Sequence, residues 1–184
     1  MLTHKGSQTL YTPRLMLRKA MPEDAAPMFQ NWASDSTVTT YLTWPSHSDP
    51  GVSQMVVDCW VKDSEKENSY HWMIVLKELG QPIGSIGVTA LDEGVGKAEI
   101  GYCIGRDWWG QGIMTEALQA VMDYLFDEIG MNRVEACHDP RNPASGAVMK
   151  KCGMTYEGTL RQFGRNNQGV CDVCFYAQLK EDRC

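Results

Sequence analysis

The most informative segment of this chain is Trp108-Trp109-Gly110-Gln111-Gly112-Ile113-Met114-Thr115-Glu116-Ala117. It joins a predicted strand, KAEIGYCIG at residues 97–105, to a predicted helix from about Ile113 to Ile129. The two glycines let backbone N–H groups turn toward a ligand, and the following helix offers unpaired N–H groups and a positive dipole end to an anion. The stretch therefore predicts a site for a pyrophosphate group.

The helix after this stretch is the most regular element of the sequence. Its apolar residues recur at helical spacing and form one stripe: Ala117, Ala120, Val121, Tyr124 and Leu125. Gly130 predicts its end. The glycine pattern alone also fits a tight turn in which Thr115 and Glu116 only fill the first helical turn. It differs from a dinucleotide-binding fingerprint, because Thr115 replaces the third glycine, and from a P-loop, because no Gly-Lys-Ser/Thr follows.

Strand and helix patterns cover the rest of the chain and predict a single domain over residues 1–184, with a core at about 12–180. Alternation predicts strands at residues 14–18, 133–138, 154–163 and 169–180, and three consecutive strands between residues 70 and 105. Helices are expected at about 22–34, 52–65 and 142–153. The chain is thus expected to form a mixed α/β (α+β) fold of about seven mostly antiparallel strands and four helices. Strand–helix–strand order in the middle implies one parallel pair.

Composition narrows the class of protein. The 184 residues include 17 Lys and Arg against 23 Asp and Glu, a formal net charge of −6. This acidic balance, without a basic cluster, argues against nucleic acid as a partner. The N-terminal residues lack a signal-peptide core, and no apolar run approaches the ~20 residues of a membrane span. We therefore expect a cytoplasmic protein with no membrane partner.

Seven cysteines without a regular spacing predict reduced thiols. Cys171 and Cys174 have the spacing of a redox or zinc pair, but they lie in a predicted strand, where residues three apart point to opposite faces. The His, Asp and Glu residues show no metal-ligand spacing, so no metal is expected.

The segment WGQGIMTEA, followed by DYLFDEIGMNRVEACHDPRNPASGAVMKKCGMTYEG, resembles the GNAT superfamily of acetyl-coenzyme A-dependent N-acetyltransferases. Within it, the segment is similar to the RimJ/RimL subgroup, which acetylates ribosomal-protein N-termini and assorted amines. RLMLR and AEIGYCI match the same subgroup, so the resemblance spans about residues 12–180. Asp107 departs from the superfamily pattern, which has Gln or Arg there. The resemblance implies a GNAT fold whose sheet is splayed between the strands near 97–105 and 133–138.

The resemblance also implies which residues hold acetyl-CoA. Backbone groups of Tyr102, Cys103 and Ile104 would pair with the pantetheine amides like an added strand. The loop would wrap the pyrophosphate with Trp109, Gly110, Gln111, Gly112, Ile113, Met114 and Thr115. Asn142 would contact a pantetheine amide, Ser145 the thioester sulfur and Lys151 the phosphate end. Local sequence alone also fits an N-cap at Asn142, an ordinary third helical residue at Ser145 and a solvated helix end at Lys151.

The implied reaction is direct attack of a neutral primary amine on the thioester, with the developing oxyanion held by a backbone N–H near residues 100–103. Glu99 is the best-placed group to take the proton of the amine, although it also suits an ordinary strand position; His71 and His138 are weaker candidates. Met149 stands where many relatives carry a Tyr as general acid. Ser145 is left as the proton donor.

The acceptor amine is inferred from the cost of deprotonation and from the aromatic residues of two segments. An α-amine of pKa ~7.7–8.0 costs only about 1–1.5 kcal/mol to deprotonate at pH 7, against roughly 4–5 kcal/mol for a lysine, so a protein N-terminus needs a weaker base. The segments 36–68 and 156–169 place aromatic residues near the acceptor: Tyr41, Trp44, Trp60 and Phe163. The alternatives are a small-molecule amine acetyltransferase, acting on a polyamine, aminoglycoside or amino acid, and a non-catalytic acyl-CoA-binding module. A homodimer is left open.

Overall fold

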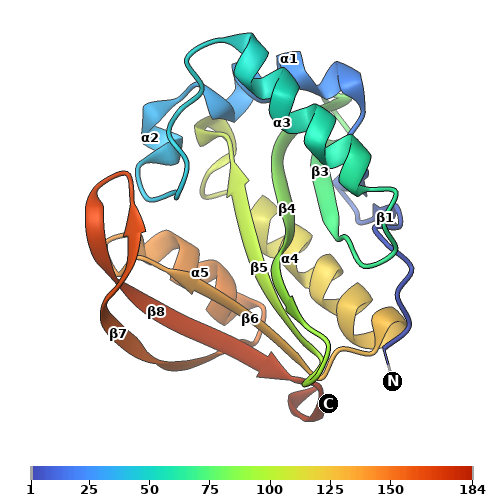
Figure 1. Ribbon diagram of the computed structural model, residues 1–184, viewed down its shortest axis with the longest axis vertical. Helices are drawn as coiled ribbons and strands as arrows, with labels where there is room; N and C mark the ends of the chain where they lie inside the picture. Colours follow the sequence, from blue (N-terminus) through green and yellow to red (C-terminus); the bar gives the residue numbers. More distant parts are fainter. Residues whose placement is uncertain (1, 184) are drawn as a thin grey trace.

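One eight-stranded sheet organises the molecule, in the order β1-β2-β3-β4-β5-β6-β8-β7 (Figure 1). The computed structural model describes residues 2–183. The strands are β1 (Leu10–Tyr11), β2 (Leu15–Arg18), β3 (His71–Leu76), β4 (Gln81–Asp92), β5 (Lys97–Ile104), β6 (Arg133–His138), β7 (Thr155–Asn166) and β8 (Gly169–Leu179). β5 and β6 are parallel, and the other neighbouring pairs are antiparallel. The predicted mixed, mostly antiparallel sheet with one parallel pair is confirmed.

Helices pack against both faces of the sheet. On one face lie α4 (Ile113–Asp123), which continues as a π-helical turn through Ile129, and α5 (Pro143–Lys151); their apolar residues share the main core with β2 to β6. On the other face α1 (Ala25–Met28) and α3 (Pro50–Asp63) enclose a second cluster around the fully buried Trp32. The short α2 (Ser36–Thr39) follows α1. Figure 1 shows α4 behind the sheet and α3 across its upper part.

β5 and β6 pair over only three residues each. Lys97 pairs with Arg133, and the pairing ends at Glu99 and Glu135. Beyond this point β5 stays paired with β4 while β6 follows β8, so the two strands diverge. In Figure 1 they meet at the bottom and open upward. This gap is the predicted splay, and it leaves backbone N–H and C=O groups of β5 without a neighbouring strand.

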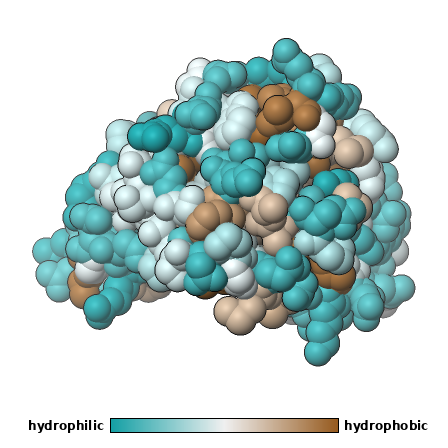
Figure 2. Space-filling view, turned by 90° about the horizontal axis from the view of Figure 1, so that it is seen from above, coloured by the Kyte–Doolittle hydropathy of each residue, from teal (hydrophilic) through white to brown (hydrophobic). Residues whose placement is uncertain are grey.

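Several element boundaries differ from the sequence-based expectation. The structure adds β1, whose two residues are too short to show alternation, and α2, which begins after Asp35 caps Thr37. The expected helix at 22–34 is a 3-10 turn, α1 and a π-helical turn in succession. α3 begins at Pro50 because the Asp49 side chain accepts from Gly51 N. Seen from above, the surface is mostly hydrophilic, with hydrophobic residues in separate patches (Figure 2).

Candidate active site

A cavity of about 760 Å³ opens where β5 and β6 diverge. Its walls come from α1, α3 and the loop after α2 on one side and from β7 and β8 on the other. The four aromatic residues that the sequence placed near the acceptor, Tyr41, Trp44, Trp60 and Phe163, all line it. Of the predicted site residues, this cavity brings together Glu99, Tyr102, Cys103, Asn142 and Ser145.

The glycine loop before α4 has the backbone that the sequence predicted. Gly110 and Gly112 both have positive φ, +72° and +74°, which favours glycine strongly. Gly112 is the N-cap of α4, and its C=O accepts the first helical hydrogen bond from Glu116 N at 3.1 Å. The N–H groups of residues 113–115 precede that bond and therefore have no partner within the helix.

An arginine that no local sequence pattern indicated anchors this loop. Arg14 Nη1 donates to Gln111 O at 2.9 Å, and Arg14 Nε pairs with Glu116 at 2.7 Å. Burial would raise the pKa of the Glu116 carboxyl, but hydrogen bonds from Thr12 and Arg14 lower it. Trp109 Nε1 donates to Ile104 O at 2.8 Å, which fixes the other end of the loop to β5.

These features fit a pyrophosphate group. A Cβ at Gly110 would meet nothing within 4 Å, and one at Gly112 would meet only Arg14 Nη2, at 3.7 Å, so the glycine backbone faces open space. Unpaired N–H groups at a helix N-terminus bind anions. The charge of the nearby Arg14 guanidinium is already balanced by Glu116.

The first turn of α5 carries two of the predicted residues. Asn142 is the N-cap, but its side chain makes no capping hydrogen bond, so its amide is free for another partner. Ser145 is the third helical residue, and its Oγ lies 3.0 Å from the hydroxyl of Tyr102. That hydroxyl also lies 3.1 Å from Ser145 O. Burial raises the pKa of Tyr102, so the phenol stays protonated in the physiological range.

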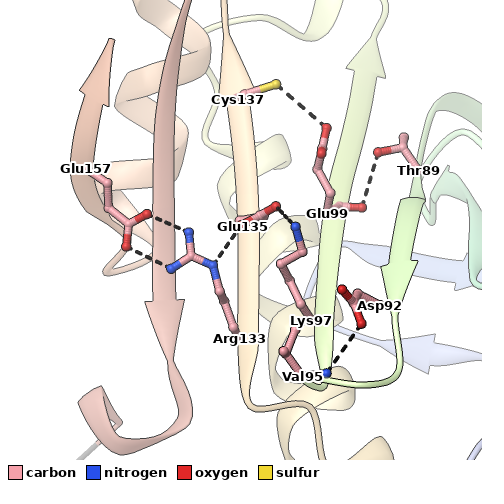
Figure 3. Close-up of polar contacts among 9 residues, drawn as sticks. All are labelled: Thr89, Asp92, Val95, Lys97, Glu99, Arg133, Glu135, Cys137 and Glu157. Atoms are coloured by element: carbon pink, nitrogen blue, oxygen red, sulfur yellow. Dashed lines mark hydrogen bonds and ion pairs between the residues drawn. The ribbon is translucent and has the colours of Figure 1, made fainter. Parts of the chain in front are cut away.

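Glu99 stands beside a network of charged residues without being part of it (Figure 3). Lys97 Nζ and Arg133 Nε both pair with Glu135, at 2.8 and 2.7 Å. Glu99 Oε1 instead accepts a long contact, 3.8 Å, from the Cys137 thiol. Among residues 2–183 no salt bridge joins Glu99 to a basic side chain, so its charge faces the cavity.

The two histidines considered as bases each pack against a neighbouring helix, His71 against α3 and His138 against α5. His71 stacks on Trp60 with ring centroids 3.8 Å apart, and burial lowers its pKa to about 3, so it is neutral and a very weak base. His138 Nδ1 lies 2.8 Å from Asp139 O. A Cβ at Gly146 would lie 2.5 Å from His138 Nε2, so this ring packs directly against α5.

The remaining predicted residues lie as follows. Burial raises the pKa of Cys103 to about 11, which leaves a neutral thiol beside Ser85. Met149 is buried in the main core. Lys151 is exposed at the last position of α5, about 9 Å along the helix from Ser145 at 1.5 Å per residue. Cys171 lines the cavity and Cys174 belongs to the core, so these strand residues do face opposite sides.

One side of the cavity is closed by contacts that the sequence did not indicate. At the tip of the β7–β8 hairpin, Asn167 Nδ2 donates to Thr39 O and Trp44 O, both at 2.8 Å. Asn167 N also donates to Leu42 O. Asp139, the other carboxylate in the cavity, is held by Arg141 and Asn166, and these hydrogen bonds keep its pKa below the usual range.

The part of the chain that the structure describes contains no cluster of three or more His, Cys, Asp or Glu side chains suited to a metal ion. Its six cysteines are free thiols; Cys184 lies outside the described residues. Over residues 2–183, none of the helices has the length and apolar character needed to span a membrane.

Comparisons with known proteins point to one family. The family model for the acetyltransferase (GNAT) domain matches residues 14–155. An uncharacterized N-acetyltransferase of Bacillus licheniformis, p20, is 34% identical over 175 residues, which cover 95% of this chain and 98% of that protein. The ribosomal-protein-serine acetyltransferase of Escherichia coli is 29% identical over 113 residues, 61% of this chain and 63% of that protein.

A solved structure of RimL, a ribosomal α-N-protein acetyltransferase in complex with coenzyme A, has the same fold. It superposes with a TM-score of 0.84 at 23% identity and covers 94% of this chain and 98% of that one.

Proposed function

This chain belongs to the GNAT family of N-acetyltransferases, and on that premise we propose that it transfers the acetyl group of acetyl-CoA to the α-amine of a protein N-terminus. The observation that carries the proposal is the placement of Ser145 and an unpaired Glu99 carboxylate in one cavity at the splay of β5 and β6. The similarity to ribosomal-protein acetyltransferases supports a protein N-terminus as the acceptor.

The glycine loop would hold the pyrophosphate through the N–H groups of residues 113–115, and Arg14 would keep the loop in place through Gln111 O. The edge of β5 at residues 102–104, which has no neighbouring strand, would bind the pantetheine amides, although Ile104 O already accepts from Trp109 Nε1. The free amide of Asn142 would add a further contact. Lys151 would meet the phosphate end. Acetyl-CoA supplies an acetyl thioester at the far end of this track.

Glu99 and Ser145 would divide the proton transfers between them. Glu99 takes the proton that the amine nitrogen loses as its bond to the acetyl carbon forms. A backbone N–H near residues 100–103 would donate to the developing oxyanion. Ser145 gives a proton to the sulfur as the carbon–sulfur bond breaks. A weak carboxylate base suits an α-amine, which costs only about 1–1.5 kcal/mol to deprotonate at pH 7.

A thiol-release assay with acetyl-CoA tests this function. Three acceptors are compared: a peptide with a free α-amine, an N-blocked peptide with a lysine side chain, and spermidine. We expect release only with the free α-amine. Preference for spermidine would move the activity to small molecules, and binding of acetyl-CoA without any turnover would support the non-catalytic module.

Ser145→Ala tests the proton donor. Because a thiol of pKa ~8.5 leaves tolerably well unaided, we expect kcat to fall by roughly 10- to 100-fold with little change in acetyl-CoA affinity. Ser64→Ala, at the far end of α3 and outside the cavity, is the control and should keep normal kcat. Normal turnover of Ser145→Ala over pH 6–9 would remove Ser145 from the mechanism.

A further inference from the structure

The floor of the acceptor side of the cavity is made of glycine. His71 on β3 pairs with Gly87 on β4, and Gly87 pairs with Gly101 on β5, so the three residues form one row across the sheet. All three line the cavity. A Cβ at Gly87 would lie 2.8 Å from His71 Cδ2, which shows that His71 projects from this same face. The imidazole therefore leans over Gly87. A Cβ at Gly101 would lie 2.7 Å from Thr89 Cγ2, so the row is bordered by one imidazole and one threonine methyl group.

The wall at the end of this floor is aromatic and uncharged. Trp60 from α3 stacks on His71, with ring centroids 3.8 Å apart and planes 30° from parallel. His71 is neutral because burial depresses its pKa to about 3. Met28 and Val56 line the same side of the cavity. A charged group placed against this wall would lose its hydration without gaining a counter-ion.

The opposite end of the floor carries the free negative charge. Glu99 lies two residues before Gly101 and therefore on the same face of β5. Neighbouring basic residues are occupied: Lys97 and Arg133 by Glu135 (Figure 3), and Arg141 by Asp139. Two strand spacings separate β5 from His71, about 10 Å. Glu99 lies a further two residues, about 7 Å, along β5, so the site is about 12 Å long, with a carboxylate at one end and an aromatic wall at the other.

We infer that the preferred acceptor carries a large apolar or aromatic group directly beside its primary amine. The amine faces Glu99, and the apolar group lies against the wall that Trp60, Met28 and Val56 form beyond this row. This inference rests on the proposed function and names the class of residue at the N-terminus of the acceptor. It disfavours polyamines and aminoglycosides, because their additional ammonium and hydroxyl groups would be desolvated against the wall.

The experiment compares tetrapeptides that differ only in residue 1, which is Phe, Leu, Ala, Ser or Lys, together with phenylalanine amide and spermidine. Thiol release gives kcat/KM for each. We expect Phe and Leu peptides to exceed the Ala and Ser peptides by at least ~10-fold, within the range that an apolar pocket discriminates. The Phe peptide and phenylalanine amide differ only in length, so this pair separates a peptide acceptor from a small one.

Trp60 variants test whether the preference for a large apolar first residue depends on the aromatic wall. Trp60→Ala should lower kcat/KM for the Phe peptide at least ~10-fold more than for the Ala peptide, and Trp60→Phe should restore most of the ratio. Tyr11→Ala, an exposed aromatic residue of β1 outside the cavity, should leave the ratio unchanged. The inference is overturned if peptides are acetylated with equal or better rates for Ala and Ser, or if Trp60→Ala lowers both peptides equally. Acetylation of no α-amine at all would instead refute the proposed function.

Discussion

Replacing Gly112 by Val tests the cofactor loop, because it adds a β-branched side chain where the backbone is left-handed. At φ +74° a residue with a side chain lowers the free energy of unfolding by ~1–2 kcal/mol relative to glycine, and a β-branched residue lowers it by the upper value. The protein offers a matched control in Gly80, which has φ +69° and open space around its Cβ in the turn between β3 and β4. We expect both variants to lose about 2 kcal/mol of unfolding free energy.

Only the Gly112 variant should also lose cofactor affinity. Its added methyl groups stand in the open space before the N–H groups of residues 113–115, so we expect the Kd for acetyl-CoA to rise at least ~10-fold, about 1.4 kcal/mol. Titration calorimetry gives Kd, and urea unfolding gives the stability of each variant. If Gly112→Val binds acetyl-CoA like the unmodified protein, or if Gly80→Val weakens binding equally, the assignment of the loop is wrong.

Three further predictions concern the interior of the protein. Tyr102→Phe should lower kcat by about 10-fold while Ser145 is present and have no effect in a Ser145→Ala background, because the hydroxyl acts by orienting Ser145; equal losses in both backgrounds would contradict this. Glu135→Gln should cost roughly 2–3 kcal/mol at pH 7 by urea unfolding, since it leaves Lys97 without its carboxylate and Arg133 with Glu157 alone. Burial would raise the pKa of Glu135, but these donors lower it; its ionised form therefore stabilises the fold above about pH 4.5, and the difference should shrink as pH falls below 4. A constant difference from pH 7 to pH 3 would refute that role. Thermal melting curves with and without reductant or chelator should coincide, and a large loss on either treatment would reveal a disulfide or metal dependence.

Local physical chemistry explains how much of the fold could be predicted. The positive φ of Gly110 and Gly112, the apolar stripe of α4 and its end at Gly130 each depend on a few neighbouring residues, so they are legible in the sequence. Alternation located the longer strands for the same reason. β1 has only two residues, and its pairing with β2 depends on long-range contacts rather than on its own pattern.

Local sequence was enough to predict the mixed α/β class, the glycine loop before α4 and candidates such as Glu99 and Ser145. The contacts between these residues and their partners come from the tertiary structure. Tyr102 meets Ser145 across 43 positions of sequence, and Arg14 reaches the loop across 97. The Glu99 carboxylate has no basic partner because Glu135 pairs with the neighbouring Lys97 and Arg133. The row of Gly87 and Gly101 beside His71 depends on the pairing register of β3, β4 and β5. Strand pairing sets these contacts, and the local sequence pattern of one strand does not specify which distant strand will pair with it.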